Sequence, residues 1–245
     1  MKGIRIDLYS PFVSFRDPGA QLYHDTLPLP PPTTLLGMAG AALGKSFEEV
    51  LVWAKSVKLH VGCRGTSGGR GKDLWNYIKI KADKKSDELT HAVLLRTFLA
   101  DMQLSVFYAS ENENAIKDLY DAFQCPYYAI TLGVSDGIAK IIDVKYFDKV
   151  TTKTETDLCN TWVCGDFSKK FKFNWEQIES IPIPQTLRPP VVKNIPVDFS
   201  IEAEGVRKAS RFVTLTFLGD KQQLLDEVVA FSFSDTSVPM FMFDG

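Results

Sequence analysis

Hydrophobic and polar positions alternate in several short segments of the chain. In residues 3–10 (GIRIDLYS), isoleucine and leucine side chains alternate with charged and polar ones, a period of two that predicts a half-buried β-strand. The same period predicts strands in residues 57–63 (VKLHVGC), 75–81 (WNYIKIK) and 103–109 (QLSVFYA). Two more strand-like sequences, YYAITLG and GIAKIIDV, follow Pro126. The first 150 residues therefore predict a β-sheet.

Two other segments have the spacing of a helix. In residues 112–123 (NENAIKDLYDAF) the apolar side chains fall on one helical face, and Pro126 ends the pattern. The prolines of residues 27–32 (LPLPPP) predict an extended lead-in, because proline suits neither a helix interior nor a sheet ladder. Thr33 or Thr34 can then cap the helix TLLGMAGAALG.

The order of these elements predicts the fold class. Strand, helix, strand, a long excursion, strand, helix and strand is the βαββαβ order of a ferredoxin-like α+β fold, with an insertion at about residues 64–95. Beyond residue 150 the pattern changes to short β segments and a proline-punctuated stretch. We therefore predict a ferredoxin-like domain in residues 1–150 and a smaller, irregular β-rich region in residues 151–245.

The first helix carries an unusual set of glycines. Gly37, Gly40 and Gly44 fall on one face, although each glycine costs about 1 kcal/mol of helix propensity relative to alanine. Something is therefore expected to approach the backbone closely there. Tight packing on another element and the approach of a nucleic-acid backbone or partner helix are equally compatible with this pattern. Gly44 can also serve as the C-cap.

Charge is distributed unevenly along the chain. The formal net charge is −2, but the window from Arg64 to Lys85 holds seven basic and two acidic residues, giving +5 there and −7 in the remainder. A basic segment on an otherwise acidic protein suggests one dedicated anion-binding surface. A solvated loop is the alternative interpretation.

Several familiar chemistries lack support in the motifs. The tripeptide GKS at residues 44–46 resembles the end of a phosphate-binding loop, but Ala39 occupies the position of the required earlier glycine. Cys159 and Cys164 have no second cysteine pair or nearby histidine, so we expect neither a metal site nor a cofactor. No stretch approaches eighteen consecutive apolar residues, so we expect no membrane span and a cytoplasmic protein.

The sequence at residues 27–44 (LPLPPPTTLLGMAGAALG) resembles the Cas-five family of CRISPR-associated RAMP proteins. These share an early strand, a Pro-Pro-Thr/Ser lead-in and a first helix rich in glycine and alanine. Residues 10–18 (SPFVSFRDP), 94–108 (LLRTFLADMQLSVFY) and 125–141 (CPYYAITLGVSDGIAKI) resemble further family segments. Together they cover residues 3–145 in the expected order.

The resemblance implies a RAMP fold whose thumb-like hairpin is the excursion at residues 64–95. It also implies a place in a type I Cascade complex, closest to type I-B or I-A, beside the large subunit and a backbone Cas-seven subunit. There the chain would hold the 5′ handle of the crRNA and meet target DNA only indirectly. The residues expected to contact RNA are Arg16, Thr33, Thr34, Gly37, Gly40, Arg64, Arg70, Lys72, Trp75, Tyr77 and Arg96.

Each class of these residues has an expected role. The basic side chains can pair with phosphates, and Trp75 or Tyr77 can stack on a splayed base. Packing within the hairpin is the alternative for the two aromatic residues.

The expected role is binding without catalysis. One branch of the family cleaves precursor RNA with Tyr, Lys and His, the last two adjacent, and this sequence contains no Lys-His dipeptide. A separate Cas-six processing enzyme is then the simpler expectation. The alternative is a metal-independent endoribonuclease in which Tyr77 acts with His24 or His91. A third possibility is a structural adaptor that contacts only protein.

Overall fold

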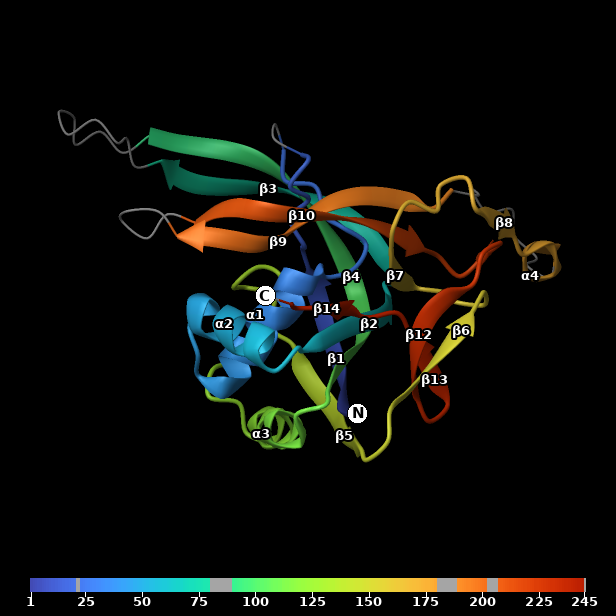
Figure 1. The fold of residues 1–245 in the computed structure, drawn as a ribbon. Coiled ribbons are helices and arrows are strands. Elements are labelled where there is room, and N and C mark those ends of the chain that lie inside the picture. The colour runs from blue at the N-terminus through green and yellow to red at the C-terminus, as the bar shows by residue number, and fades with distance from the viewer. Residues whose placement is uncertain (21–22, 80–89, 180–188, 202–206, 245) are drawn as a thin grey trace.

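The computed structural model describes residues 1–20, 23–79, 90–179, 189–201 and 207–244 (Figure 1). Its elements are, in chain order, β1 (Lys2–Val13), α1 (Pro32–Leu43), α2 (Phe47–Ser56), β2 (His60–Thr66), β3 (Gly69–Lys79), β4 (Thr90–Ser110), α3 (Glu113–Gln124), β5 (Lys140–Phe147), β6 (Thr151–Glu155), β7 (Thr161–Cys164), β8 (Phe171–Phe173), α4 (Trp175–Glu179), β9 (Val191–Ile201), β10 (Arg207–Leu218), β11 (Gln222–Leu224), β12 (Val228–Phe233), β13 (Thr236–Val238) and β14 (Phe241–Met242).

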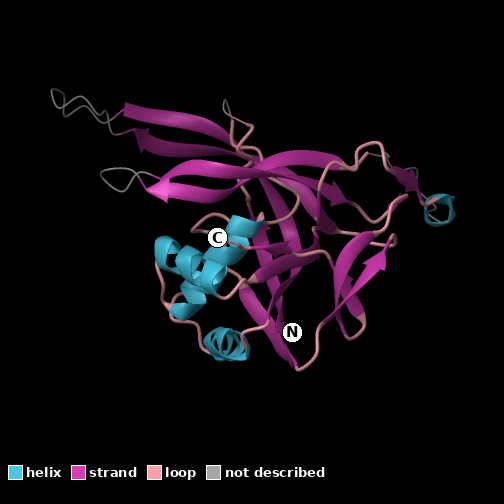
Figure 2. Ribbon diagram, in the orientation of Figure 1, coloured by secondary structure: helices cyan, strands magenta, loops and turns pink. Residues whose placement is uncertain are grey.

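The central feature is an antiparallel sheet in the order β5-β1-β4-β2, with α1 and α3 packed on one face (Figure 2). Alternation along β1 directs Ile4, Ile6 and Leu8 toward these helices, and all three are buried. Burying a side chain of this kind stabilises the fold by about 1.5–3 kcal/mol. The strand order and the helix positions confirm the ferredoxin-like α+β class predicted from the sequence.

Helix α1 begins at Pro32, two residues earlier than a Thr33 cap requires and three earlier than a Thr34 cap requires. Pro31 is its N-cap and makes no side-chain capping bond, so the prediction that Thr33 or Thr34 caps the helix is wrong. Pro32 occupies the first helical position, where its fixed φ suits the helix and its missing N–H costs nothing. At the other end Gly44 has a left-handed φ of 69°, which confirms it as the C-cap.

Helix α2 was absent from the sequence prediction. Its N-cap Ser46 accepts a hydrogen bond from the Glu49 N–H, and the Glu49 carboxylate accepts one from the Ser46 N–H. This capping box is worth about 1 kcal/mol, and it accounts for the GKS tripeptide as a helix start.

The segment YYAITLG forms no strand, contrary to the prediction. The backbone N–H groups of Tyr127 and Tyr128 donate to the carbonyls of Ala42 and Ala41 in the last turn of α1. Because these bonds satisfy free carbonyls at the helix end, the segment serves as a cap for α1 rather than as a sheet strand.

Strand β3 and the first half of β4 form the predicted thumb-like hairpin, hereafter the thumb hairpin. Its register runs from Gly69 opposite Ala100 to Lys79 opposite Thr90. Residues 80–89, part of the predicted excursion, lie outside the described residues. Since β4 continues into the central sheet, the hairpin and the core share one strand.

The residues after 150 are rich in β-structure, as expected. Strands β7, β10 and β9 continue the large sheet beyond β2, while β6, β12 and β13 form a separate three-stranded sheet. Strand β9 contains Pro196 and lies at the sheet edge, where a missing N–H is tolerated. Figure 1 shows β9 and β10 projecting to the same side as the thumb hairpin.

The second hairpin, β9–β10, packs over α2. The ring of Phe199 lies 5.6 Å from that of Phe47 in an edge-on contact, and Arg207 Nε lies 3.0 Å from Glu48 Oε1. The smaller sheet covers part of the central-sheet face that the helices leave open, since Phe107 and Phe233 are fully buried against each other.

Candidate nucleic-acid interface

Residues 14–20 and 23–27, hereafter the lead-in segment, precede the proline run and contact the thumb hairpin through an isolated parallel bridge between His24 and Arg96. The His24 N–H donates to the Leu95 carbonyl at 2.9 Å, and the Thr97 N–H donates to the His24 carbonyl at 2.8 Å. These bonds place His24 next to the side chains at the root of the hairpin. The ring centroids of His24 and Trp75 are 5.7 Å apart, and the Arg96 guanidinium lies 5.4 Å from the Trp75 ring centroid.

Arg96 is held by two carboxylates. Its Nη2 lies 2.8 Å from Asp73 Oδ2, and its Nη1 lies 3.2 Å from Asp136 Oδ2. The hydrogen bond from Arg96 lowers the pKa of Asp73, so this pair is ionised at neutral pH. Within the protein, Arg96 therefore positions the aromatic cluster as much as it offers a charge to a ligand.

His24 is neutral at pH 7. Burial lowers its pKa, and the positive charges of Arg16 and Arg96 lower it further. The backbone of Arg16 pairs with that of Thr26, two residues after His24, so Arg16 belongs to the same part of the fold. The structure thus brings together three predicted RNA-contact residues, Arg16, Trp75 and Arg96, around a histidine that the binding prediction did not include.

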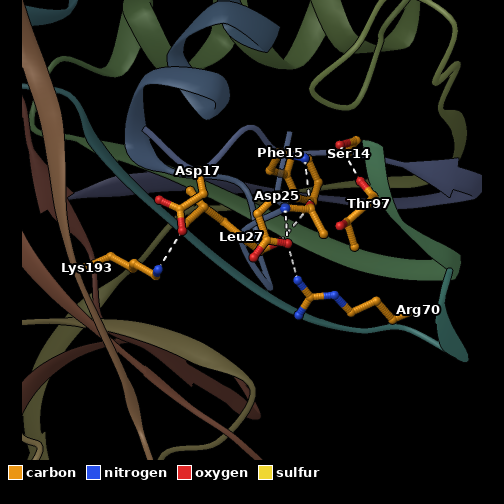
Figure 3. Close-up of polar contacts among 9 residues, drawn as sticks. Ser14, Phe15, Asp17, Asp25, Leu27, Arg70, Thr97 and Lys193 are labelled. Carbon is orange, nitrogen blue, oxygen red and sulfur yellow. Dashed lines mark hydrogen bonds and ion pairs between the residues drawn. The ribbon is translucent and has the colours of Figure 1, made fainter. Parts of the chain in front are cut away.

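The lead-in segment is tied to both hairpins by ion pairs (Figure 3). Asp25 pairs with Arg70 of the thumb hairpin, and the buried Asp17 pairs with Lys193 of β9. The predicted phosphate ligand Arg70 is therefore occupied by a carboxylate in this state. Any RNA phosphate at Arg70 would have to compete with Asp25.

Hydrogen bonds within the lead-in segment and to β4 fix the conformation of its backbone. The Phe15 N–H donates to Thr26 Oγ1 at 2.9 Å and the Leu27 N–H donates to the Phe15 carbonyl at 2.7 Å. The Ser14 hydroxyl donates to the Thr97 carbonyl at 2.8 Å, which fixes the segment to β4. These buried groups fix the backbone on either side of the exposed Arg16, which pairs with Thr26.

A small cavity gathers three of the predicted residues at the start of α1. Arg16, Thr33 and Thr34 all line a cavity of about 190 Å³. The N-terminus of a helix carries a partial positive charge that stabilises an anion, although here Pro32 has no N–H and the Thr34 and Leu35 N–H groups donate to the Pro31 carbonyl. A cationic guanidinium and two hydroxyls beside it make this the most suitable phosphate position among the predicted residues.

The two remaining cations lie apart from this cavity. Lys72 is exposed on the thumb hairpin, and it forms no ion pair with the described residues. Arg64 extends from β2, where it lines a different cavity and donates to Cys159 Sγ at 3.2 Å. The expectation that Arg64, Arg70 and Lys72 act as one group therefore has no support in their positions.

The three glycines of α1 have different surroundings. A Cβ at Gly40 would lie 3.1 Å from the Val50 side chain, so the packing alternative accounts for this buried glycine. Gly37 has open space where a Cβ would stand and remains accessible. Gly44 meets the Tyr127 ring and has a positive φ.

Of the residues of the alternative nuclease, Tyr77 and His91 lie at neighbouring register positions of the hairpin, and His24 lies nearer its root. Tyr77 is paired with Ala92 through the backbone, and its side chain lies outside the described residues. Ala92 is four positions from Arg96, the bridge partner of His24, which corresponds to about 13 Å along an extended strand. His91 is one position farther from His24 again, so the two histidines are not neighbours.

Neither a metal-binding cluster nor a membrane-spanning helix is found among the described residues. Among the described residues, no cluster of three or more histidine, cysteine or acidic side chains could hold a metal ion. In the same part of the chain, each helix is too short or too polar to cross a bilayer.

The structure therefore combines a ferredoxin-like core with a long thumb hairpin and a β-rich continuation. The chain belongs to the Cas-five family, because the family model described as CRISPR-associated protein (Cas_Cas5) matches residues 3–176. No curated protein matches it in sequence.

A solved structure shares this fold. The crystal structure of a CRISPR protein from Archaeoglobus fulgidus has a TM-score of 0.54 and 15% identity, covering 99% of this chain and 100% of that one. A chain of a CRISPR RNA-guided surveillance complex has 17% identity and a TM-score of 0.48, covering 91% of this chain and 90% of its own.

Proposed function

We propose that this chain is a non-catalytic subunit of a type I CRISPR effector complex that holds the 5′ handle of the guide RNA. Its membership of the Cas-five family supports a place in CRISPR defence. The observation that carries RNA binding is the position of Arg16. This cation lines the cavity at the N-terminus of α1, and its backbone pairs with that of Thr26, two residues after His24, whose ring lies beside Trp75.

The proposed path of the RNA follows from these neighbours. A phosphate sits at Arg16, Thr33 and Thr34, where the helix dipole adds to the guanidinium charge. The next base reaches Trp75, a residue that is 40% exposed and lies beside His24 and Arg96, and stacks at this cluster. Lys72, which is nearer the hairpin root than Trp75 and on the other face of the hairpin, contributes a second phosphate contact.

The proposed partners are a backbone Cas-seven subunit and the large subunit. The thumb hairpin presents Leu74 and Val93, which are 73% and 64% exposed and lie on adjacent register positions of one face. Exposed aliphatic side chains on a hairpin of this kind mark a protein interface. Contact with target DNA would then be indirect, through the guide RNA.

The absence of chemistry is also part of the proposal. A general base must lie within hydrogen-bond reach of the 2′-hydroxyl, either directly or through one water molecule. The backbone separation of His24 and Tyr77 does not favour their cooperation as acid and base, and the sequence has no Lys-His dipeptide. We therefore assign RNA processing to another protein.

Ultraviolet crosslinking of the assembled complex tests this function. We expect guide RNA to crosslink to this chain, with the modified peptides mapping to residues 16–34 or 69–97. Crosslinks to the other subunits without any to this chain would show it to be an adaptor that contacts only protein.

A further inference from the structure

The central-sheet face opposite the helices is open at its hairpin end. A cavity of about 570 Å³ lies there, well within the size range of small-molecule sites. The sheet register builds its floor from two rows across three strands. One row is Asp7, Ser105 and Arg64, and the next is Tyr9, Gln103 and Thr66.

The two charged side chains of this cavity differ in their partners: Asp7 has hydrogen bonds to its carboxylate, whereas Arg64 has no charged partner among the described residues. The Asp7 carboxylate accepts hydrogen bonds from the Arg5 guanidinium at 2.9 Å and from the Ser105 hydroxyl at 2.6 Å. Arg64 has the thiol of Cys159 as its hydrogen-bond partner and no ion pair among the described residues. A half-buried guanidinium of this kind favours binding of an anion.

One acidic residue, Glu155, interacts electrostatically with Arg64 but forms no ion pair with it. The charge of Arg64 contributes to a lowered pKa of Glu155, but the hydrogen bond from Lys153 is the larger cause. The Glu155 carboxylate also accepts a hydrogen bond from the Ser237 hydroxyl at 3.0 Å. Its acceptor capacity is therefore directed away from Arg64.

The other lining groups suit a nucleobase. Tyr9 supplies an aromatic ring whose hydroxyl donates to Asp101 Oδ1 at 3.0 Å, which holds the ring on the sheet face. The amide side chains of Gln103 and Asn160 can each donate to and accept from a base edge. Ile142, 57% exposed, supplies an apolar wall.

We propose that this cavity holds one unstacked nucleotide of the bound RNA, separate from the contacts at Arg16 and Trp75. Its base stacks on Tyr9, its edge meets Gln103 or Asn160, and its phosphate pairs with Arg64. The proposal rests on the proposed function, since it requires that the chain binds RNA. It also explains why Arg64 lies away from the other predicted phosphate ligands.

Double-mutant cycles test this nucleotide site. The complete chain is titrated with guide RNAs that each carry one abasic position in the handle, using wild type, Tyr9→Leu and Tyr9→Phe. In wild type, the abasic position that belongs in the cavity should weaken binding by roughly 5- to 100-fold. That loss should disappear in Tyr9→Leu and persist in Tyr9→Phe, which keeps the stacking ring and gives up only the hydroxyl bond to Asp101.

The possible outcomes distinguish failure of the nucleotide site from failure of RNA binding itself. Equal weakening of Tyr9→Leu at every abasic position, or no weakening at all, would overturn the nucleotide site while leaving RNA binding intact. Failure of wild type to bind any handle RNA would overturn both the proposed function and the site. If Tyr9→Leu does not fold, Gln103→Ala replaces it and must couple to a single abasic position. Arg64→Gln should in addition reduce the log–log salt slope by about 0.7.

Discussion

The guanidinium of Arg96 donates two hydrogen bonds to the carboxylate of Asp73, the residue directly opposite it in the thumb hairpin. The distances are 3.2 Å from Nε and 2.8 Å from Nη2. Because the Arg96 side chain is only 15% exposed, this pair connects the two strands at the point where the hairpin leaves the core. It also keeps the guanidinium over the Trp75 ring.

Replacing Asp73 by asparagine should therefore destabilise the hairpin root. We expect Asp73→Asn to lower the free energy of unfolding by about 1 kcal/mol, since one charge-assisted pair is weakened in a partly exposed position. Denaturant unfolding measures this change. Asp226→Asn is the matched control, because its exposed pair with Lys170 lies elsewhere and should be worth less than half as much. Equal losses in the two variants would contradict the role assigned to Arg96.

Salt dependence separates unpaired cations from paired ones. The double variant Arg16→Gln and Lys72→Gln should weaken handle RNA binding and reduce the magnitude of the log–log salt slope by roughly 1.4, from two contacts of about 0.7 each. Arg70→Gln should change the slope less, because Asp25 already neutralises that cation. Titrations at several salt concentrations measure the slope.

Lys117→Gln provides the control for that experiment. Lys117 is an exposed cation on α3 that pairs with Glu113, away from both hairpins. Its removal should leave the slope unchanged. A slope change as large as that of the double variant would mean that RNA binding depends only on the overall charge of the protein.

The two glycines of α1 should respond in opposite ways to a bulky side chain. Gly40→Leu should cost about 1–3 kcal/mol of stability, because a Cβ there already meets Val50 and the Lys45 carbonyl at 3.1 Å. Gly37→Leu should be stable, since that position opens to free space. Thermal unfolding of the pair provides the comparison, and equal stability of the two variants would contradict the packing role of Gly40.

His60 should make the fold less stable at mildly acidic pH. Burial lowers its pKa, and its ring lies 4.9 Å from that of Phe231. The unfolded chain therefore binds a proton at His60 from about pH 6.5 downward, while the folded chain resists it, so stability falls as pH decreases below 6.5. His60→Phe cannot titrate and should lose less stability between pH 7.5 and 5.5 than wild type. His24 contributes a similar pH dependence of stability in wild type and in His60→Phe. An identical loss of stability in the two proteins would therefore contradict the role of His60.

Local patterns explain which parts of the fold could be predicted. Alternation along β1 and β4 and the amphipathic spacing of α3 depend on neighbouring residues, so they are visible in the sequence. The capping box of α2 was also visible, but Ser46 was considered as part of a phosphate loop rather than as a helix start. The proline-containing strand β9 was hidden because only its position at the sheet edge makes Pro196 acceptable.

The candidate site depends more on tertiary structure. The pairing of Asp17 with Lys193 joins residues 176 positions apart, and no local signal marks either as a partner of the other. Sequence reasoning grouped Arg64 with Arg70 because they are close along the chain. The register of β2 instead places Arg64 on the sheet face with Ser105, in a different cavity.

RNA binding without cleavage is tested by mixing purified chain with labelled repeat RNA in EDTA and resolving the products on native and denaturing gels. We predict a shifted band on the native gel and intact RNA on the denaturing gel, for wild type and for His24→Ala and His91→Ala alike. Specific cleavage at the base of the repeat that disappears in His24→Ala or His91→Ala would contradict this prediction and establish a metal-independent endoribonuclease. Intact RNA with no shift would contradict RNA binding itself.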